Sequence, residues 1–207
     1  MIDARDALVR LKEGNRRFVS DIRKRDTLEN PTKFEDMTAG QQPFAVILGC
    51  SDSRVPVEII FDQGLGDLFV IRVAGNIVAP SLIGSVEFAA ERFGTRLVVV
   101  LGHSRCGAVL ATLEHLEHPA DHPSQNIRSI VDYIRPSVEE LFDTDLRHDH
   151  DALVRHAVRA NVRASVTQLR HGSTLLERLI QSDGLRVIGA EYSLHTGEVD
   201  YLEPIVP

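Results

Sequence analysis

The sequence predicts an α/β fold: a mainly parallel central β-sheet flanked by helices, with an antiparallel edge strand and a protruding N-terminal helix. Short apolar runs alternate with longer segments whose apolar residues recur at helical spacing. The run 97–101 consists entirely of valine and leucine, as expected for a strand covered on both faces. Because no internal repeat or linker interrupts this pattern, we expect a single domain over residues 1–207, with a helical arm over about 1–40.

The first segment of the chain is amphipathic. Over residues 3–18, Leu8, Leu11 and Phe18 fall on one helical stripe, and the basic residues lie elsewhere. We expect a helix whose stripe either covers a partner molecule or packs on its own core. Residues 25–43 are polar and contain two prolines, which predicts a loop with a short helix.

The remaining strands are predicted from apolar runs bounded by glycine, proline or polar residues. They are 44–48, 68–73, 97–101, 185–190 and, at the sheet edge, 199–202. The helices are predicted from apolar periodicity, with Pro80 in the first turn of one and Ser173 capping another. They are a short turn over 57–61 and helices over 80–93, 107–116, 125–142, 151–171 and 173–181. Pro136 predicts a break or kink in the helix over 125–142.

Composition narrows the class of protein. The formal net charge of −7 and the lack of a dense lysine and arginine run argue against a nucleic-acid partner. No apolar stretch approaches the length of a membrane span, so we expect no membrane partner. The charged N-terminal segment has no signal-peptide core, and we therefore expect a cytoplasmic protein.

Both cysteines lie in short segments that directly follow predicted strands. Cys50 follows the strand 44–48, and His103 and Cys106 follow the strand 97–101. Because the ends of neighbouring parallel strands face one crevice, we expect these three side chains to converge. Two thiolates and one imidazole, with a fourth position left over, are the pattern of a catalytic zinc site. The alternative is a pair of buried structural cysteines near an unrelated histidine.

Two charged residues near Cys50 have a predicted role beside the metal. A zinc ion held by two thiolates and a neutral imidazole has no net charge, so it activates water less strongly than one held by three histidines. A neighbouring group that accepts a hydrogen bond from the water would compensate. Asp52, held by a charge-assisted pair with Arg54, suits that role. Asp52 is also close enough in sequence to be a fourth zinc ligand in a closed state of the site.

Two signatures far apart in the chain resemble those of the β-class carbonic anhydrases, in particular the bacterial type. They are Cys50-Ser51-Asp52-Ser53-Arg54-Val55 and Gly102-His103-Ser104-Arg105-Cys106-Gly107. The resemblance extends over nearly the whole chain. It includes the runs 11–18 and 64–70, Arg72 and the pair Asn161-Val162.

The resemblance implies a zinc enzyme that interconverts carbon dioxide and bicarbonate by attack of zinc-bound hydroxide on carbon dioxide. It implies one zinc ion per chain, held by the residues that match Cys50, His103 and Cys106, with Asp52 and Arg54 as the catalytic dyad. It also implies a set of substrate-binding residues. These are Gln41, which acts across a dimer interface, a small apolar wall of Phe69, Ala74 and Phe88, and Gly107, whose backbone N–H contacts bound anion. The implied assembly is a dimer or tetramer of this chain.

The sequence departs from the family at three places. The positions of Phe88 and Ala74 are often tyrosine and valine, which implies a drier and wider pocket here. Some bacterial members have an inhibitory bicarbonate pocket that needs a tryptophan where this chain has Ile47. Arg72 and Tyr192 match that pocket, but without the indole we do not expect it.

Two other functions stay open at this stage. The first is hydrolysis of carbonyl sulfide or carbon disulfide on the same scaffold, because these linear molecules differ from carbon dioxide mainly in size and polarity. The second is a non-catalytic module that is stabilised by zinc.

Overall fold

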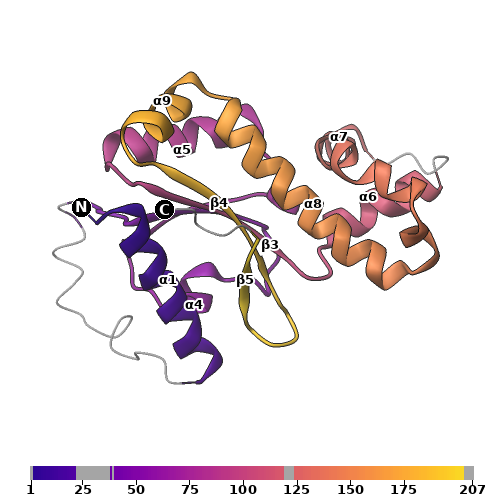
Figure 1. Ribbon diagram of the computed structural model, residues 1–207, viewed down its shortest axis with the longest axis horizontal. Coiled ribbons are helices and arrows are strands. Elements are labelled where there is room, and N and C mark those ends of the chain that lie inside the picture. Colours follow the sequence, from indigo (N-terminus) through magenta and orange to yellow (C-terminus); the bar gives the residue numbers. More distant parts are fainter. Residues whose placement is uncertain (1, 22–37, 39, 119–123, 203–207) are drawn as a thin grey trace.

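A five-stranded sheet organises the chain in a computed structural model, which describes residues 2–21, 38, 40–118 and 124–202. The strand order is β2–β1–β3–β4–β5 (Figure 1). The strands are β1 (Ala45–Gly49), β2 (Leu68–Arg72), β3 (Leu97–His103), β4 (Arg186–Tyr192) and β5 (Val199–Tyr201). The first four are parallel and β5 is antiparallel to β4, which confirms the predicted α/β class.

The register brings the carboxyl ends of the three strands β1, β2 and β3 together. Gly49, the last residue of β1, lies opposite Arg72 of β2 and Leu101 of β3. Residues that follow these strands therefore leave the sheet at one edge, as the sequence predicts.

Helices cover both faces of the sheet (Figure 1). On one face, α1 (Ala4–Val19) and α4 (Val57–Ile60) pack against alternate residues of β1, β3 and β4. On the other, the sheet packs against α5 (Pro80–Arg92), α8 (His150–His171) and α9 (Thr174–Ser182). Leu8 and Leu11 of α1 are buried, so the predicted N-terminal helix packs its apolar stripe on the core of its own chain.

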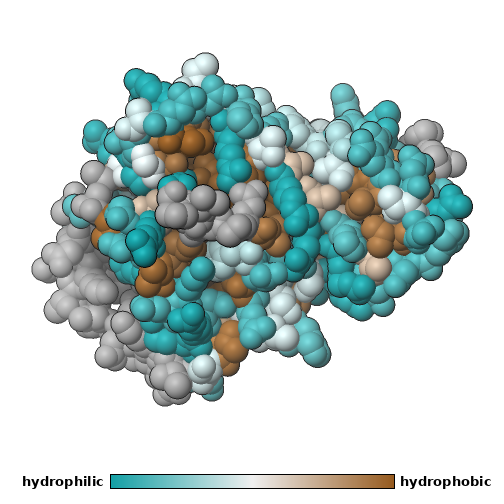
Figure 2. Space-filling view, viewed as in Figure 1, coloured by the Kyte–Doolittle hydropathy of each residue, from teal (hydrophilic) through white to brown (hydrophobic). Residues whose placement is uncertain are grey.

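A third apolar cluster extends beyond the carboxyl end of the sheet. It is built by α6 (Gly107–Glu117), α7 (Gln125–Val138), the first half of α8 and two short 3-10 turns, η2 (Glu139–Asp143) and η3 (Asp145–His148). These helices and turns form a lobe at one side of the molecule, and Figure 2 shows hydrophobic side chains on the surface of this lobe. Cys50 and Cys106 belong to the same buried cluster.

Two predictions about element boundaries need correction. The strand predicted over 97–101 continues to His103, and the one over 185–190 runs from Arg186 to Tyr192, since the two pair along their whole length. The break predicted near Pro136 in the helix over 125–142 is confirmed: α7 ends at Val138, two residues after the proline, and the chain continues as the 3-10 turn η2. The short helix predicted within 25–43 falls almost entirely outside the described residues.

Candidate metal centre

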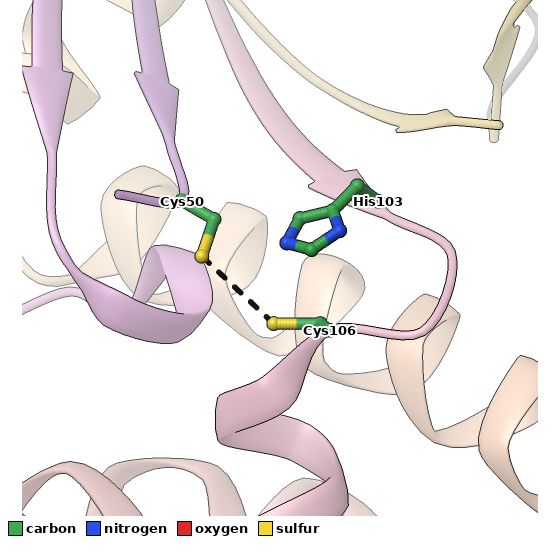
Figure 3. A group of neighbouring side chains, drawn as sticks. All are labelled: Cys50, His103 and Cys106. Atoms are coloured by element: carbon green, nitrogen blue, oxygen red, sulfur yellow. Dashed lines mark hydrogen bonds between the residues drawn. The ribbon is translucent and has the colours of Figure 1, made fainter. Parts of the chain in front are cut away.

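Three potential metal ligands meet at the carboxyl end of the sheet (Figure 3). Cys50 directly follows β1, His103 is the last residue of β3, and Cys106 is the residue before α6. Their ligand atoms all lie within 4.8 Å of one another, and the two sulfur atoms are 3.9 Å apart. All three side chains are buried. The predicted convergence of these residues is therefore confirmed.

The donor set fits a zinc ion. Nδ1 of His103 lies 3.1 Å from the carbonyl oxygen of Ser104, which places the ring proton on Nδ1 and leaves Nε2 as a lone-pair donor. Nε2 is buried and has no hydrogen-bond partner among the described residues, and one ring nitrogen faces the two sulfur atoms in Figure 3. Two sulfurs bound to one tetrahedral zinc ion would lie about 3.8 Å apart, close to the spacing seen here.

The two thiols do not form a disulfide. Both cysteines are free, and their sulfur separation of 3.9 Å is far longer than an S–S bond. The hydrogen bond from Cys106 lowers the pKa of Cys50, and holding that shared proton raises the pKa of Cys106. The pair thus already favours one thiolate, which is the form that binds metal.

The Asp52–Arg54 pair lies beside these ligands. Nε and Nη2 of Arg54 donate to the two carboxylate oxygens of Asp52 over 2.9 Å and 2.7 Å, and the Arg54 backbone N–H adds a third bond over 3.0 Å. This bonding holds the pKa of Asp52 well below its usual range, so the carboxylate is ionised. Oδ2 of Asp52 lies 3.8 Å from Nε2 of His103, which places the carboxylate at the edge of the ligand cluster.

Arg72 holds the loop that carries Cys50 and Asp52, a role that the sequence did not reveal. Its Nε donates to the carbonyl oxygen of Cys50 over 3.0 Å, and its Nη2 donates to that of Asp52 over 2.7 Å. The backbone N–H of Ser51 also donates to the carbonyl of Val73 over 3.2 Å. Arg72 thereby fixes the backbone on both sides of Ser51.

A tight turn after β2 also contacts the cluster. The backbone N–H of Gly75 donates to Sγ of Cys50 over 3.4 Å. Gly75 is the middle residue of a 3-10 turn, η1 (Ala74–Asn76), and its φ of 74° is one that glycine adopts readily. Ala74, one of the expected substrate-binding residues, therefore lies next to the site. Gly107, another, follows Cys106 as the exposed first residue of α6.

The other expected substrate-binding residues lie far from the cluster of their own chain. Gln41 is exposed and precedes β1, at the opposite end of that strand from Cys50. Phe69 lies opposite Val46, which is four residues, or about 13 Å of strand, before Cys50. Phe88 of α5 packs its ring on Phe69 with centroids 6.3 Å apart, yet remains 54% exposed. Within one chain, these three side chains therefore do not adjoin the ligand cluster.

Comparison with known proteins agrees with this geometry. Residues 45–199 match the carbonic anhydrase family model. Carbonic anhydrase 2 of Mycobacterium tuberculosis (strain CDC 1551 / Oshkosh) is 39% identical over 191 residues, covering 90% of this chain and 87% of the relative. The carbonic anhydrase of Mycolicibacterium smegmatis is 37% identical over 190 residues, covering 92% and 89%.

Solved structures share the same fold. The β-carbonic anhydrase CafA of Aspergillus fumigatus superimposes with a TM-score of 0.73 at 26% identity, covering 98% of this chain and 91% of that one. A tetrameric β-carbonic anhydrase of Sordaria macrospora gives a TM-score of 0.70 at 27% identity, covering 85% and 88%. In the described part of the chain, none of the helices has the length and apolar character needed to span a membrane. By sequence, fold and ligand cluster, the chain belongs to the β-carbonic anhydrase family.

Proposed function

We propose that this chain binds one zinc ion through Cys50, His103 and Cys106 and interconverts carbon dioxide and bicarbonate. One observation carries the proposal: an ionised, doubly anchored carboxylate, Asp52, lies beside a buried Cys–His–Cys cluster in which Nε2 of His103 has no hydrogen-bond partner among the described residues. A cluster that only stabilised the fold would gain nothing from this carboxylate. The membership of the chain in a family of carbonic anhydrases supports the same reaction.

The residues around the cluster have separate roles in the proposed reaction. Bound zinc supplies Lewis-acid activation of water near neutral pH. Asp52 accepts a hydrogen bond from the reacting water and thereby orients it, because an ionised carboxylate can only accept. Arg54 keeps Asp52 ionised and fixes its direction through two parallel bonds. Ser104 holds the His103 ring through its carbonyl oxygen.

The substrate pocket is divided between two copies of the chain. Ala74 and Gly107 belong to the chain that holds the metal, and the Gly107 N–H at the start of α6 suits an anion such as bicarbonate. Gln41, Phe69 and Phe88 would come from the second copy, so self-association into a dimer or tetramer is part of the proposal. The Sordaria macrospora relatives are tetrameric, which supports it.

We place the enzyme in the cytoplasm. Its two cysteines are free thiols with their sulfur atoms 3.9 Å apart, and such a pair persists as a metal site in a reducing compartment.

The test measures metal content and rate on the same purified sample. We expect about one zinc ion per chain and hydration of carbon dioxide well above the buffer background in a stopped-flow assay. Sulfide release from carbonyl sulfide and carbon disulfide is measured in parallel. Sulfide release without carbon dioxide hydration would assign the chain to the alternative hydrolase, and absence of stoichiometric metal would refute the proposed centre.

A further inference from the structure

Helix α8 inserts three polar side chains into the irregular segment that follows β2. Nδ2 of Asn161 donates to the carbonyl oxygen of Gly75 over 2.8 Å. Oγ of Ser165 donates to the carbonyl of Asn76 over 3.0 Å. Nε2 of Gln168 donates to the carbonyl of Val78 over 2.9 Å. The donors are spaced at i, i+4 and i+7, so they form one polar row on an otherwise apolar helix face.

This row compensates for a backbone that cannot pair with the sheet. Gly75 and Asn76 both have positive φ, of 74° and 45°, and both are buried. Their carbonyl groups lie outside the strand ladder, and a buried carbonyl without a partner is costly. The side chains of α8 provide the missing donors.

Close packing of α8 on the sheet makes this reach possible. Val162, the neighbour of Asn161, contacts the sheet over Gly102 of β3 and Gly189 of β4. A Cβ atom would lie 2.5 Å from a methyl group of Val162 if it were added at Gly102, and 2.8 Å from one if it were added at Gly189. The two glycines thus let α8 approach the carboxyl end of β3, close to the lobe of α6 and α7 (Figure 1).

The first member of the row is linked to the metal centre through a single residue. Asn161 binds the carbonyl of Gly75, and the N–H of the same Gly75 donates to Sγ of Cys50 over 3.4 Å. Only the two backbone torsions of Gly75 separate these groups, and glycine torsions are the least restricted of any residue. Without the bond from Asn161, nothing else in the described structure holds the Gly75 carbonyl.

We propose that Asn161 is a positioning residue for the metal centre: by binding the carbonyl of Gly75, it holds the N–H of Gly75 against the sulfur of Cys50. The inference rests on the proposed zinc site. An N–H donor to a metal-bound thiolate stabilises its charge and fixes the direction of its lone pairs, and such partners tune metal affinity. Ser165 and Gln168 serve the same segment but bind carbonyls one and three residues farther from the contact with Cys50.

The test compares Asn161→Ala with Ser165→Ala, because each removes one donor from the same buried row. Zinc affinity is measured by chelator competition, and the thiolate-to-metal absorption bands are recorded after substitution with cobalt. For Asn161→Ala we expect affinity to fall about 10-fold to 100-fold and the bands to shift. For Ser165→Ala we expect affinity within about twofold of the wild type and unchanged bands, although thermal stability falls in both.

Equal affinities and identical cobalt spectra for the two variants would overturn the inference. If Asn161→Ala does not fold, Asn161→Ser replaces it, since a serine hydroxyl can bond to its own helix backbone but is too short to reach Gly75. Wild-type protein without zinc would instead refute the proposed function, so the two failures are distinguishable.

Discussion

The two ends of the parallel sheet differ in whether a single chain gathers potential site residues there. At the carboxyl end, Cys50, His103 and Cys106 meet within 4.8 Å and are buried. At the amino end, Gln41 and the 54% exposed Phe88 face outward, away from these three ligands. Parallel strands bring one set of loops to one edge of the sheet, and in this chain that set contains all three ligands. The proposed function takes the rest of the substrate pocket from a second copy of the chain.

The largest expected effect comes from removing a ligand at the carboxyl end. Cys106→Ser should reduce zinc occupancy from about one ion per chain to below about a tenth, because a serine hydroxyl is a poor zinc ligand. Hydration of carbon dioxide should fall to the buffer background. Elemental analysis and stopped-flow assay of one preparation would measure both.

Metal removal from the wild type is the matched control for that variant. A chelator should abolish hydration, and zinc should restore it, which separates loss of metal from loss of fold. Full activity of metal-free protein, or of Cys106→Ser, would mean that the ligand cluster does not carry the reaction.

The next effect tests whether the carboxyl end is catalytic or only structural. Asp52→Asn keeps the shape of the side chain but removes the charge that Arg54 anchors, and hydration should fall about 10²-fold or more. Zinc content should stay at the wild-type level, because Asp52 lies at the edge of the cluster rather than within it. Asp151→Asn is the control. Asp151 is exposed, and its Oδ1 lies 3.8 Å from Nη2 of Arg105, so this substitution also removes a carboxylate charge beside an arginine but should leave the rate unchanged. An unchanged rate in Asp52→Asn would revive the non-catalytic zinc module.

The carboxyl end was also the more predictable of the two. The residues before Cys50 and His103 form short apolar runs that are typical of buried strands, and parallel topology then places the ends of those strands together. The positions of the ligands therefore follow from the order of residues along two strands. The helix on which Asn161 lies could likewise be predicted, because its apolar stripe repeats over several turns.

The groups that hold the ligands could not be predicted in this way. The sequence places Arg72 near the end of a predicted strand, and the residues beside it in the sequence do not indicate that its guanidinium binds the carbonyls of Cys50 and Asp52. Gly75 contributes a backbone N–H, which no residue pattern records. Asn161 is a polar residue on the buried face of a helix and belongs to the pair Asn161-Val162 that resembles the family, but neither signal identifies its partner, which is 86 residues away in the sequence.

The third prediction concerns the amino end of the sheet. Gln41→Ala should lower hydration about tenfold, the effect of one lost hydrogen bond to substrate, without loss of zinc. A mixed assembly can show where Gln41 acts. When Gln41→Ala and Cys106→Ser chains are produced together, the metal site of the first should receive Gln41 from the second.

In that mixture we expect the rate per bound zinc to recover toward the wild-type value. Recovery requires that the glutamine and the metal ligands belong to different chains. A rate per zinc that stays at the level of Gln41→Ala alone would place Gln41 in the site of its own chain or outside any site.

The smallest expected effect also lies at the amino end and tests the exposed aromatic surface. Phe88 packs on Phe69 and on Phe93, with centroids 6.3 Å and 5.6 Å away, yet more than half of it is exposed. If a second copy covers it, Phe88→Ala should weaken self-association about tenfold in analytical ultracentrifugation. The rate in fully assembled protein should fall less than about threefold.

Ile127→Ala is the matched control for Phe88→Ala, because Ile127 of α7 is an apolar side chain that is 53% exposed on the lobe beyond the other end of the sheet. We expect it to leave self-association unchanged. An equal response of both variants would show that loss of exposed apolar area in general, and not this surface, controls assembly. No response to Phe88→Ala would mean that Phe88 lies outside the interface. A different surface would then have to bring Gln41 to the metal centre of a second chain.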